Sequence, residues 1–228
     1  MKFFSYESPF SQVSLKLCYS CYLNLLWMIC SIPIVTLGAS TTALYYTTLK
    51  IVRDEEETSL VRMFFRSFRE NFRQSTVLWL ILLAAGLLLA GDGYILYHLR
   101  ASSTGAAAVV WTVLLAVLIA AAVLYAIVLI YVFPLVASVS NTNWAMVKNS
   151  FLIGTHYLFC TILVFAIHFA LFFLAVSVFT PLIIFGEGLC ALLSSYLLSN
   201  VIRACSYDPA QAATGGQDEA EDEDGEDA

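Results

Sequence analysis

The chain has 228 residues, of which 60% are hydrophobic and only 12% carry a charge. Soluble domains have about twice that share of charged residues, so this composition excludes an ordinary soluble fold. Several apolar stretches run for about twenty residues, the length that a helix needs to cross a bilayer. Because a backbone in lipid must satisfy its own hydrogen bonds, the sequence predicts an all-α polytopic membrane helical bundle.

The net charge of −6 comes from the C-terminal residues 206–228. Nine of the 17 acidic residues lie from Asp208 onwards, with no lysine or arginine among them, which leaves 11 basic against 8 acidic residues in the rest of the chain. This segment lacks apolar side chains that could anchor a fold, and we expect a disordered acidic tail. Its sign argues against nucleic acid as a partner. Residues 1–205 are then expected to form one transmembrane domain.

The predicted membrane elements follow one another in chain order. The first covers 13–35, and the second covers 40–52, which is short enough to be re-entrant. Three more apolar stretches follow, of which the last is too long for one crossing and is divided at the turn between Ser177 and Pro181. The resulting elements are 76–97, 106–133, 156–176 and 178–202. The sequence thus predicts five to six membrane elements, and three hairpins are favoured.

Residues 60–74 predict an amphipathic helix at the cytoplasmic interface. Apolar side chains recur at helical spacing on one face, and Arg62, Arg66, Arg69 and Arg73 form a narrow stripe beside it. A helix of this kind lies in the membrane surface with its arginines toward anionic headgroups. The alternative is a solvated cytoplasmic helix that packs on its neighbours.

Lysine and arginine residues predict the orientation. Six of the 11 lie between Lys50 and Arg73, so that linker should be cytoplasmic. If 40–52 crosses the membrane, the N-terminus is also cytoplasmic and only Arg100 lies outside. If it does not cross, Lys2 and Lys16 move outside as well. We therefore expect both termini in the cytoplasm.

Residues 27–79 resemble the YesL-like family of bacterial integral membrane proteins, whose function is unknown. The resemblance is carried by SIPIVTLGASTTALYY (31–46), KIVRD (50–54) and FFRSFRENFRQ (64–74) followed by Trp79. It implies a small multi-pass protein of the bacterial plasma membrane, of a kind often associated with sugar-uptake transporters and glycan-utilisation genes. The acidic tail departs from the family pattern. No catalytic residues are established for the family, so none carry over.

Polar side chains within the apolar stretches are candidate functional residues, because each is costly in lipid unless it is paired or hydrated. Glu187, between two glycines, is either a proton or cation site or a solvated residue at the outer end of its hairpin. Asn24 and His168 are expected to form hydrogen bonds between helices.

The segment from Pro33 to Thr42 interrupts the first hairpin with small and hydroxyl-bearing residues. Pro33, Thr36, Gly38, Ser40 and Thr41 are its candidate functional residues. Such a break is typical of the interrupted helices that form solute sites in transporters. It equally suits a tight reversal between two helices.

No catalytic or metal-site pattern is present in the sequence. Cys18 and Cys21 have the spacing of a metal-binding pair, but no second pair or nearby histidine completes it. We predict no enzymatic activity, cofactor or metal. Two functions stay open: a non-catalytic accessory protein of carbohydrate uptake, with transporter subunits or a second copy as partner, or a small oligomeric transporter or channel that uses the Pro33–Thr42 break and Glu187.

Overall fold

The computed structural model describes residues 9–55, 58–177 and 182–206, and within these ranges every regular element is a helix. The elements are α1 (Pro9–Cys30), the 3-10 turn η1 (Ile34–Thr36), α2 (Leu37–Val52), α3 (Leu60–Ser102), α4 (Ala106–Ser138), α5 (Asn143–His156), α6 (Leu158–Ser177) and α7 (Leu182–Ser206). The all-α prediction is confirmed. The predicted acidic tail lies outside the described residues, apart from Ser206.

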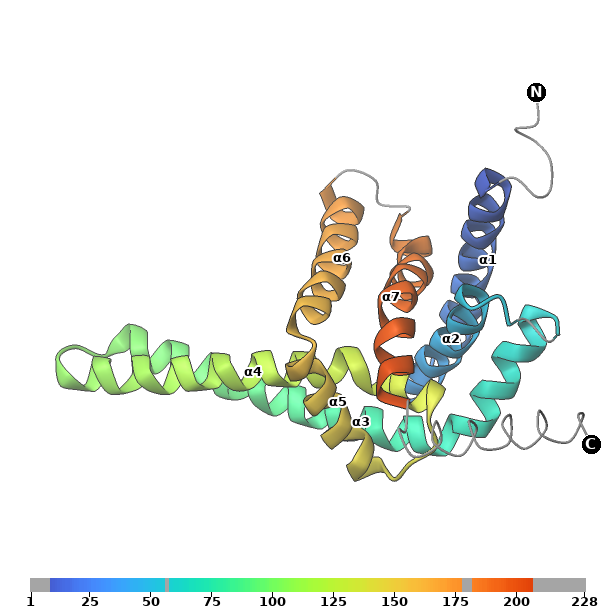
Figure 1. The fold of residues 1–228 in the computed structure, drawn as a ribbon. Coiled ribbons are helices and arrows are strands. Elements are labelled where there is room, and N and C mark those ends of the chain that lie inside the picture. Colours follow the sequence, from blue (N-terminus) through green and yellow to red (C-terminus); the bar gives the residue numbers. More distant parts are fainter. Residues whose placement is uncertain (1–8, 56–57, 178–181, 207–228) are drawn as a thin grey trace, which may run out of the picture.

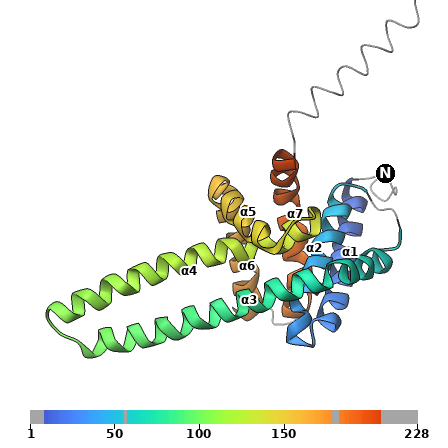
Figure 2. The ribbon, with the colours of Figure 1, turned by 90° about the horizontal axis from the view of Figure 1, so that it is seen from below.

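Three of the described helices, α3, α4 and α6, are long and apolar enough to cross a membrane. Their large apolar side chains point outward, with Leu88 69%, Val109 64% and Phe172 68% exposed. Water would penalise so much exposed apolar surface, whereas lipid does not. α3 and α4 lie side by side as an arm that extends well beyond the other helices (Figures 1 and 2).

Helix α2 forms the centre of the bundle. Twelve of its 16 residues are buried, and it packs against α1, α3, α4 and α7. Its small side chains, such as Ala39 and Ala43, allow the neighbouring helices to approach closely. The element predicted over 40–52 is therefore a core helix, although its length of about 24 Å is less than the roughly 30 Å of the hydrocarbon.

Consecutive helices pair as hairpins. In the α1–α2 hairpin, the Lys16 ammonium lies 2.8 Å from an Asp54 carboxylate oxygen at one end, and the Trp27 indole donates to Thr41 Oγ1 near the other. In the α3–α4 hairpin, Arg100 Nε donates to Thr112 Oγ1 at 2.6 Å beside the connecting turn. α6 packs against α7.

Helix α3 joins two elements that the sequence separates. The interfacial helix predicted over 60–74 and the span predicted over 76–97 are one continuous helix of 43 residues. No proline or glycine lies between Leu60 and Gly86 to interrupt it. At about 1.5 Å per residue, 43 residues rise roughly 65 Å along the helix path, about twice the thickness of the hydrocarbon, and the arginine-bearing first turns lie at an angle to the long part of α3 beside α4 (Figure 1).

Helix α4 continues past the end predicted for it. The sequence places that end at residue 133 because proline removes a helical hydrogen bond, but Pro134 lies inside α4, which ends at Ser138. Phe133, Leu135 and Val136 are buried, so tertiary packing holds this segment helical. Membrane helices tolerate proline inside a well-packed helix, and the last turn of α4 has a further contact, in which Ser138 Oγ donates to the Pro134 carbonyl.

Candidate functional site

The predicted helix break between α1 and α2 is a closed turn. The Thr36 hydroxyl lies 2.7 Å from the carbonyl oxygens of both Cys30 and Pro33, and Ser40 Oγ lies 2.7 Å from Ser31 Oγ. Together with the Trp27–Thr41 hydrogen bond, these contacts tie the end of α1 to the start of α2. The hydroxyls of the break are thus used to reverse the chain.

Gly38 holds this turn against α3. A Cβ atom at this position would lie 2.5 Å from the Ser75 carbonyl oxygen and 2.6 Å from Trp79 Cβ. The Trp79 indole donates at 2.8 Å to the carbonyl of Ile34, inside η1. Only glycine permits such a close approach of the two helices.

Two further hydroxyl pairs connect α2 to its neighbours inside the core. Thr42 Oγ1 lies 2.8 Å from Ser75 Oγ on α3, and Thr48 Oγ1 lies 2.9 Å from Ser195 Oγ on α7. All four side chains are buried. These pairs were not predicted from the sequence. The threonine-rich composition of 41–48 could have indicated them, because buried hydroxyls require hydrogen-bond partners.

The three candidate intramembrane residues come from α1, α6 and α7. Asn24 is 1% exposed, and its Oδ1 accepts a hydrogen bond from the Gly188 N–H at 2.7 Å, which confirms the expected contact between helices. His168 Nδ1 lies 2.9 Å from the carbonyl of Val164 on its own helix, so this contact is not the predicted interhelical one. Glu187 is half-buried and interacts electrostatically with His168.

The surroundings of Glu187 include polar groups that the sequence did not single out. Tyr45 of α2 is 4% exposed and interacts electrostatically with Glu187. In the same group of helices, the buried Ser194 hydroxyl is a hydrogen-bonding neighbour of Tyr45, and the buried Ser20 hydroxyl has no hydrogen-bond partner among the described residues. The break residues bond instead to α1 and α3, so the two predicted features form separate groups.

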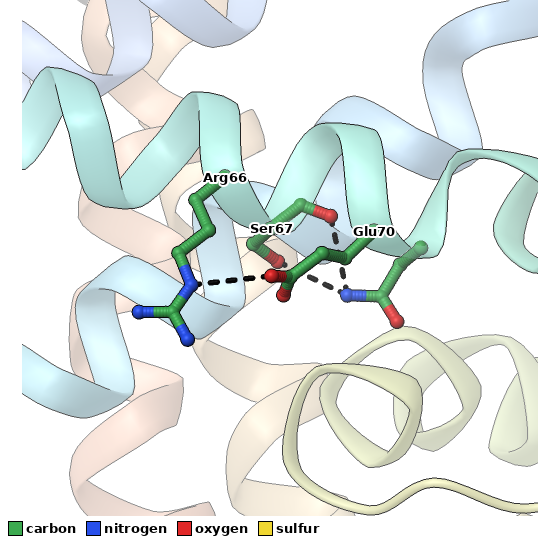
Figure 3. Close-up of polar contacts among 4 residues, drawn as sticks. Arg66, Ser67 and Glu70 are labelled. Carbon is green, nitrogen blue, oxygen red and sulfur yellow. Dashed lines mark hydrogen bonds and ion pairs between the residues drawn. The ribbon is translucent and has the colours of Figure 1, made fainter.

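The four arginines of the predicted stripe are all exposed on the first turns of α3. The apolar face beside them is divided: Phe64 is fully buried and Phe68 packs against the core, whereas Phe65 and Phe72 are 37% and 39% exposed. Arg66 Nε lies 3.2 Å from Glu70 Oε1, one turn further along the helix (Figure 3). The helix is therefore docked on the bundle through part of its phenylalanine face.

The described residues contain no group of three or more His, Cys, Asp or Glu side chains that could hold a metal ion. Cys18 and Cys21 are exposed on α1 as free thiols. Chemically, the arrangement offers buried hydroxyl pairs, one half-buried carboxylate on α7, and a basic outer surface on α3.

Comparison with known proteins gives one match. The family described as "Protein of unknown function, DUF624" matches residues 21–92, which run from α1 through the break and α2 into α3. Neither the curated proteins nor the solved structures contain a significant match. The matched segment contains the closed turn, the core helix and the arginine stripe, and it is similar to a family whose function is unknown.

Proposed function

We propose that this chain is a non-catalytic accessory protein of the bacterial plasma membrane that associates with carbohydrate uptake. The carbohydrate part of the proposal comes from the resemblance of residues 27–79 to the YesL-like family, which the match to 21–92 supports. The accessory role is supported by the way the polar side chains of α2 are paired. The hydroxyls of α2 bond to neighbouring helices, so these polar groups of the core are used for helix packing.

The exposed arm of α3 and α4 is the surface best placed to contact a partner subunit. Leu88 is 69% exposed on α3, whereas Leu78 on the same helix is 1% exposed. A photo-crosslinking amino acid at position 88, in native membranes, is expected to capture permease subunits of a sugar transporter. The same amino acid at position 78 serves as the matched control and should capture none. Capture of this chain alone from position 88 would count heavily against the proposal.

A small oligomeric transporter or channel is the second candidate, and the observation that favours it is the half-buried Glu187 on α7, which interacts electrostatically with His168 and Tyr45. A carboxylate within a membrane helix is a common feature of ion and proton pathways. If this candidate is correct, proteoliposomes should show solute or proton flux that Glu187→Gln abolishes. Asp92→Asn, which changes an exposed carboxylate of α3, should leave the flux unchanged. Absence of flux across sugars, cations and protons would exclude the candidate.

A further inference from the structure

The first turns of α3 carry an open groove with a volume of about 680 Å³. Its lining includes Val61, Arg62, Phe65, Arg66, Arg69 and Glu70, and these six residues are called the basic groove. Arg73 belongs to the same stripe along the helix, but it does not line the groove. The structure thus distinguishes Arg73 from the other three arginines, whereas their helical spacing places all four on one stripe.

The basic groove is suited to an anion. Its three arginines and one glutamate give a net charge of +2. The contact between Arg66 and Glu70 holds the Arg66 guanidinium in place along the helix, and Arg62 and Arg69 lie one turn before it and one turn after it. Guanidinium groups are planar donors that match the geometry of phosphate oxygens.

The basic groove also has an apolar side, formed by Phe65 and Val61. Phe65 is 37% exposed, and its ring packs edge-on against Phe68 at 6.5 Å between centroids. Phe64 lies on the side of the helix opposite to the arginines. It is buried in the core, so the arginines face outward. A phospholipid has a phosphate next to its apolar chains, which matches arginines next to Phe65. A free anion would contact only the arginines.

We propose that the basic groove binds the phosphate of one anionic phospholipid, with Arg62, Arg66 and Arg69 around the phosphate and Phe65 against the glycerol and upper acyl chain. The proposal rests on the membrane location within the proposed function, and it specifies a discrete lipid site in place of general attraction along the whole stripe. It does not depend on a transporter partner, so its test and the crosslinking test can fail independently.

The test uses the purified full-length chain in a neutral detergent, with thermal unfolding followed as dioleoyl-phosphatidylglycerol is titrated. Phosphatidylglycerol should raise the Tm saturably, and phosphatidylcholine should not. Arg62→Gln, Arg66→Gln and Arg69→Gln should each raise the apparent Kd by about fivefold, and Phe65→Ala should weaken binding as well. Arg73→Gln is the matched control and should change the Kd by less than about twofold.

The possible results separate a lipid site from its alternatives. If Arg73→Gln weakens binding as much as the other three substitutions, the attraction is diffuse and the discrete site is wrong. If inorganic phosphate alone displaces the lipid and Phe65→Ala has no effect, the groove binds anions and not lipid. If no substitution changes the titration, the proposal is overturned. Because all these side chains are exposed, unchanged elution on size exclusion will show that the variants remain folded.

Discussion

At the residue scale, Gly38 determines how closely α2 approaches α3. A Cβ atom there would meet the Ser75 backbone oxygen and Trp79 Cβ within 2.6 Å, so Gly38→Ala forces the two helices apart. Overpacking of this kind costs about 1–3 kcal/mol, which corresponds to a Tm roughly 2–12 °C lower. Thermal unfolding in detergent measures the effect.

Gly91→Ala is the control for this prediction. No atom lies within 4 Å of a Cβ at position 91, in the exposed part of α3. Alanine is also the better helix former by about 1 kcal/mol, so the Tm should stay the same or rise. Equal losses for both variants would show that the close approach at Gly38 is not the cause.

Removing either partner of the hydrogen bond between Thr48 and Ser195 is expected to reduce stability by a different amount. Thr48 Oγ1 also reaches the Leu44 carbonyl at 2.9 Å, so Ser195→Ala leaves the threonine with a partner. Thr48→Val instead leaves the fully buried Ser195 hydroxyl without its partner on α2. We expect Thr48→Val to be the more destabilising change, by about 1 kcal/mol.

A double-mutant cycle measures this coupling through thermal unfolding. In Thr48→Val with Ser195→Ala, both polar groups are removed, so the combined loss should be smaller than the sum of the single losses. Additive losses would mean that the two hydroxyls, 2.9 Å apart, do not interact energetically.

At the scale of the element, the continuity of α3 has a measurable consequence. Spin labels on ketone-bearing amino acids at positions 73 and 88 lie 15 residues apart on one helix, so their backbone sites should be about 22 Å apart. Both positions are exposed. Positions 109 and 124 on α4, exposed and with the same spacing, provide the control. A clearly shorter distance for 73–88 alone would place a break between the interfacial and spanning parts.

Helix positions were predictable wherever a long apolar run encodes them, as in α4 and α6. The role of α2 was not, because its Gly, Ala, Ser and Thr residues are only weakly hydrophobic. Its burial results from the small size of these side chains and from partners such as Ser75 and Ser195, which lie 33 and 147 positions away in the chain. The helical state of Pro134 has the same origin, since buried neighbours override its local preference.

The basic groove shows a similar limit of prediction. The arginine stripe follows from helical spacing alone, and the structure places all four arginines on the exposed side of α3. Helical spacing places Phe64 and Phe65 about 100° apart on the apolar face, but only the docking of α3 on the bundle buries the first and exposes the second. That division creates the groove, and it depends on contacts distant in the sequence.

At the scale of the whole molecule, charged contacts bring several chain segments to one end. Lys16 of α1 pairs with Asp54 after α2, and its ammonium lies 6.0 Å from the ring centroid of Tyr196 on α7. Lys50 pairs with Glu55 in the same linker at 3.2 Å. The start of α1, the end of α2 and the C-terminal half of α7 therefore share an end with the linker that carries most of the basic residues.

This arrangement predicts that both termini lie in the cytoplasm, because the positive-inside rule places the basic linker there. Green fluorescent protein fused to either terminus should fluoresce, and alkaline phosphatase at the same positions should be inactive. Fusions after Thr104, in the turn between α3 and α4, should behave in the opposite way, since Arg100 is the only basic residue predicted outside. An external N-terminus with a cytoplasmic C-terminus would contradict the prediction. It would mean that α1 and α2 do not cross as a pair, despite the ion pair between Lys16 and Asp54 that closes their hairpin.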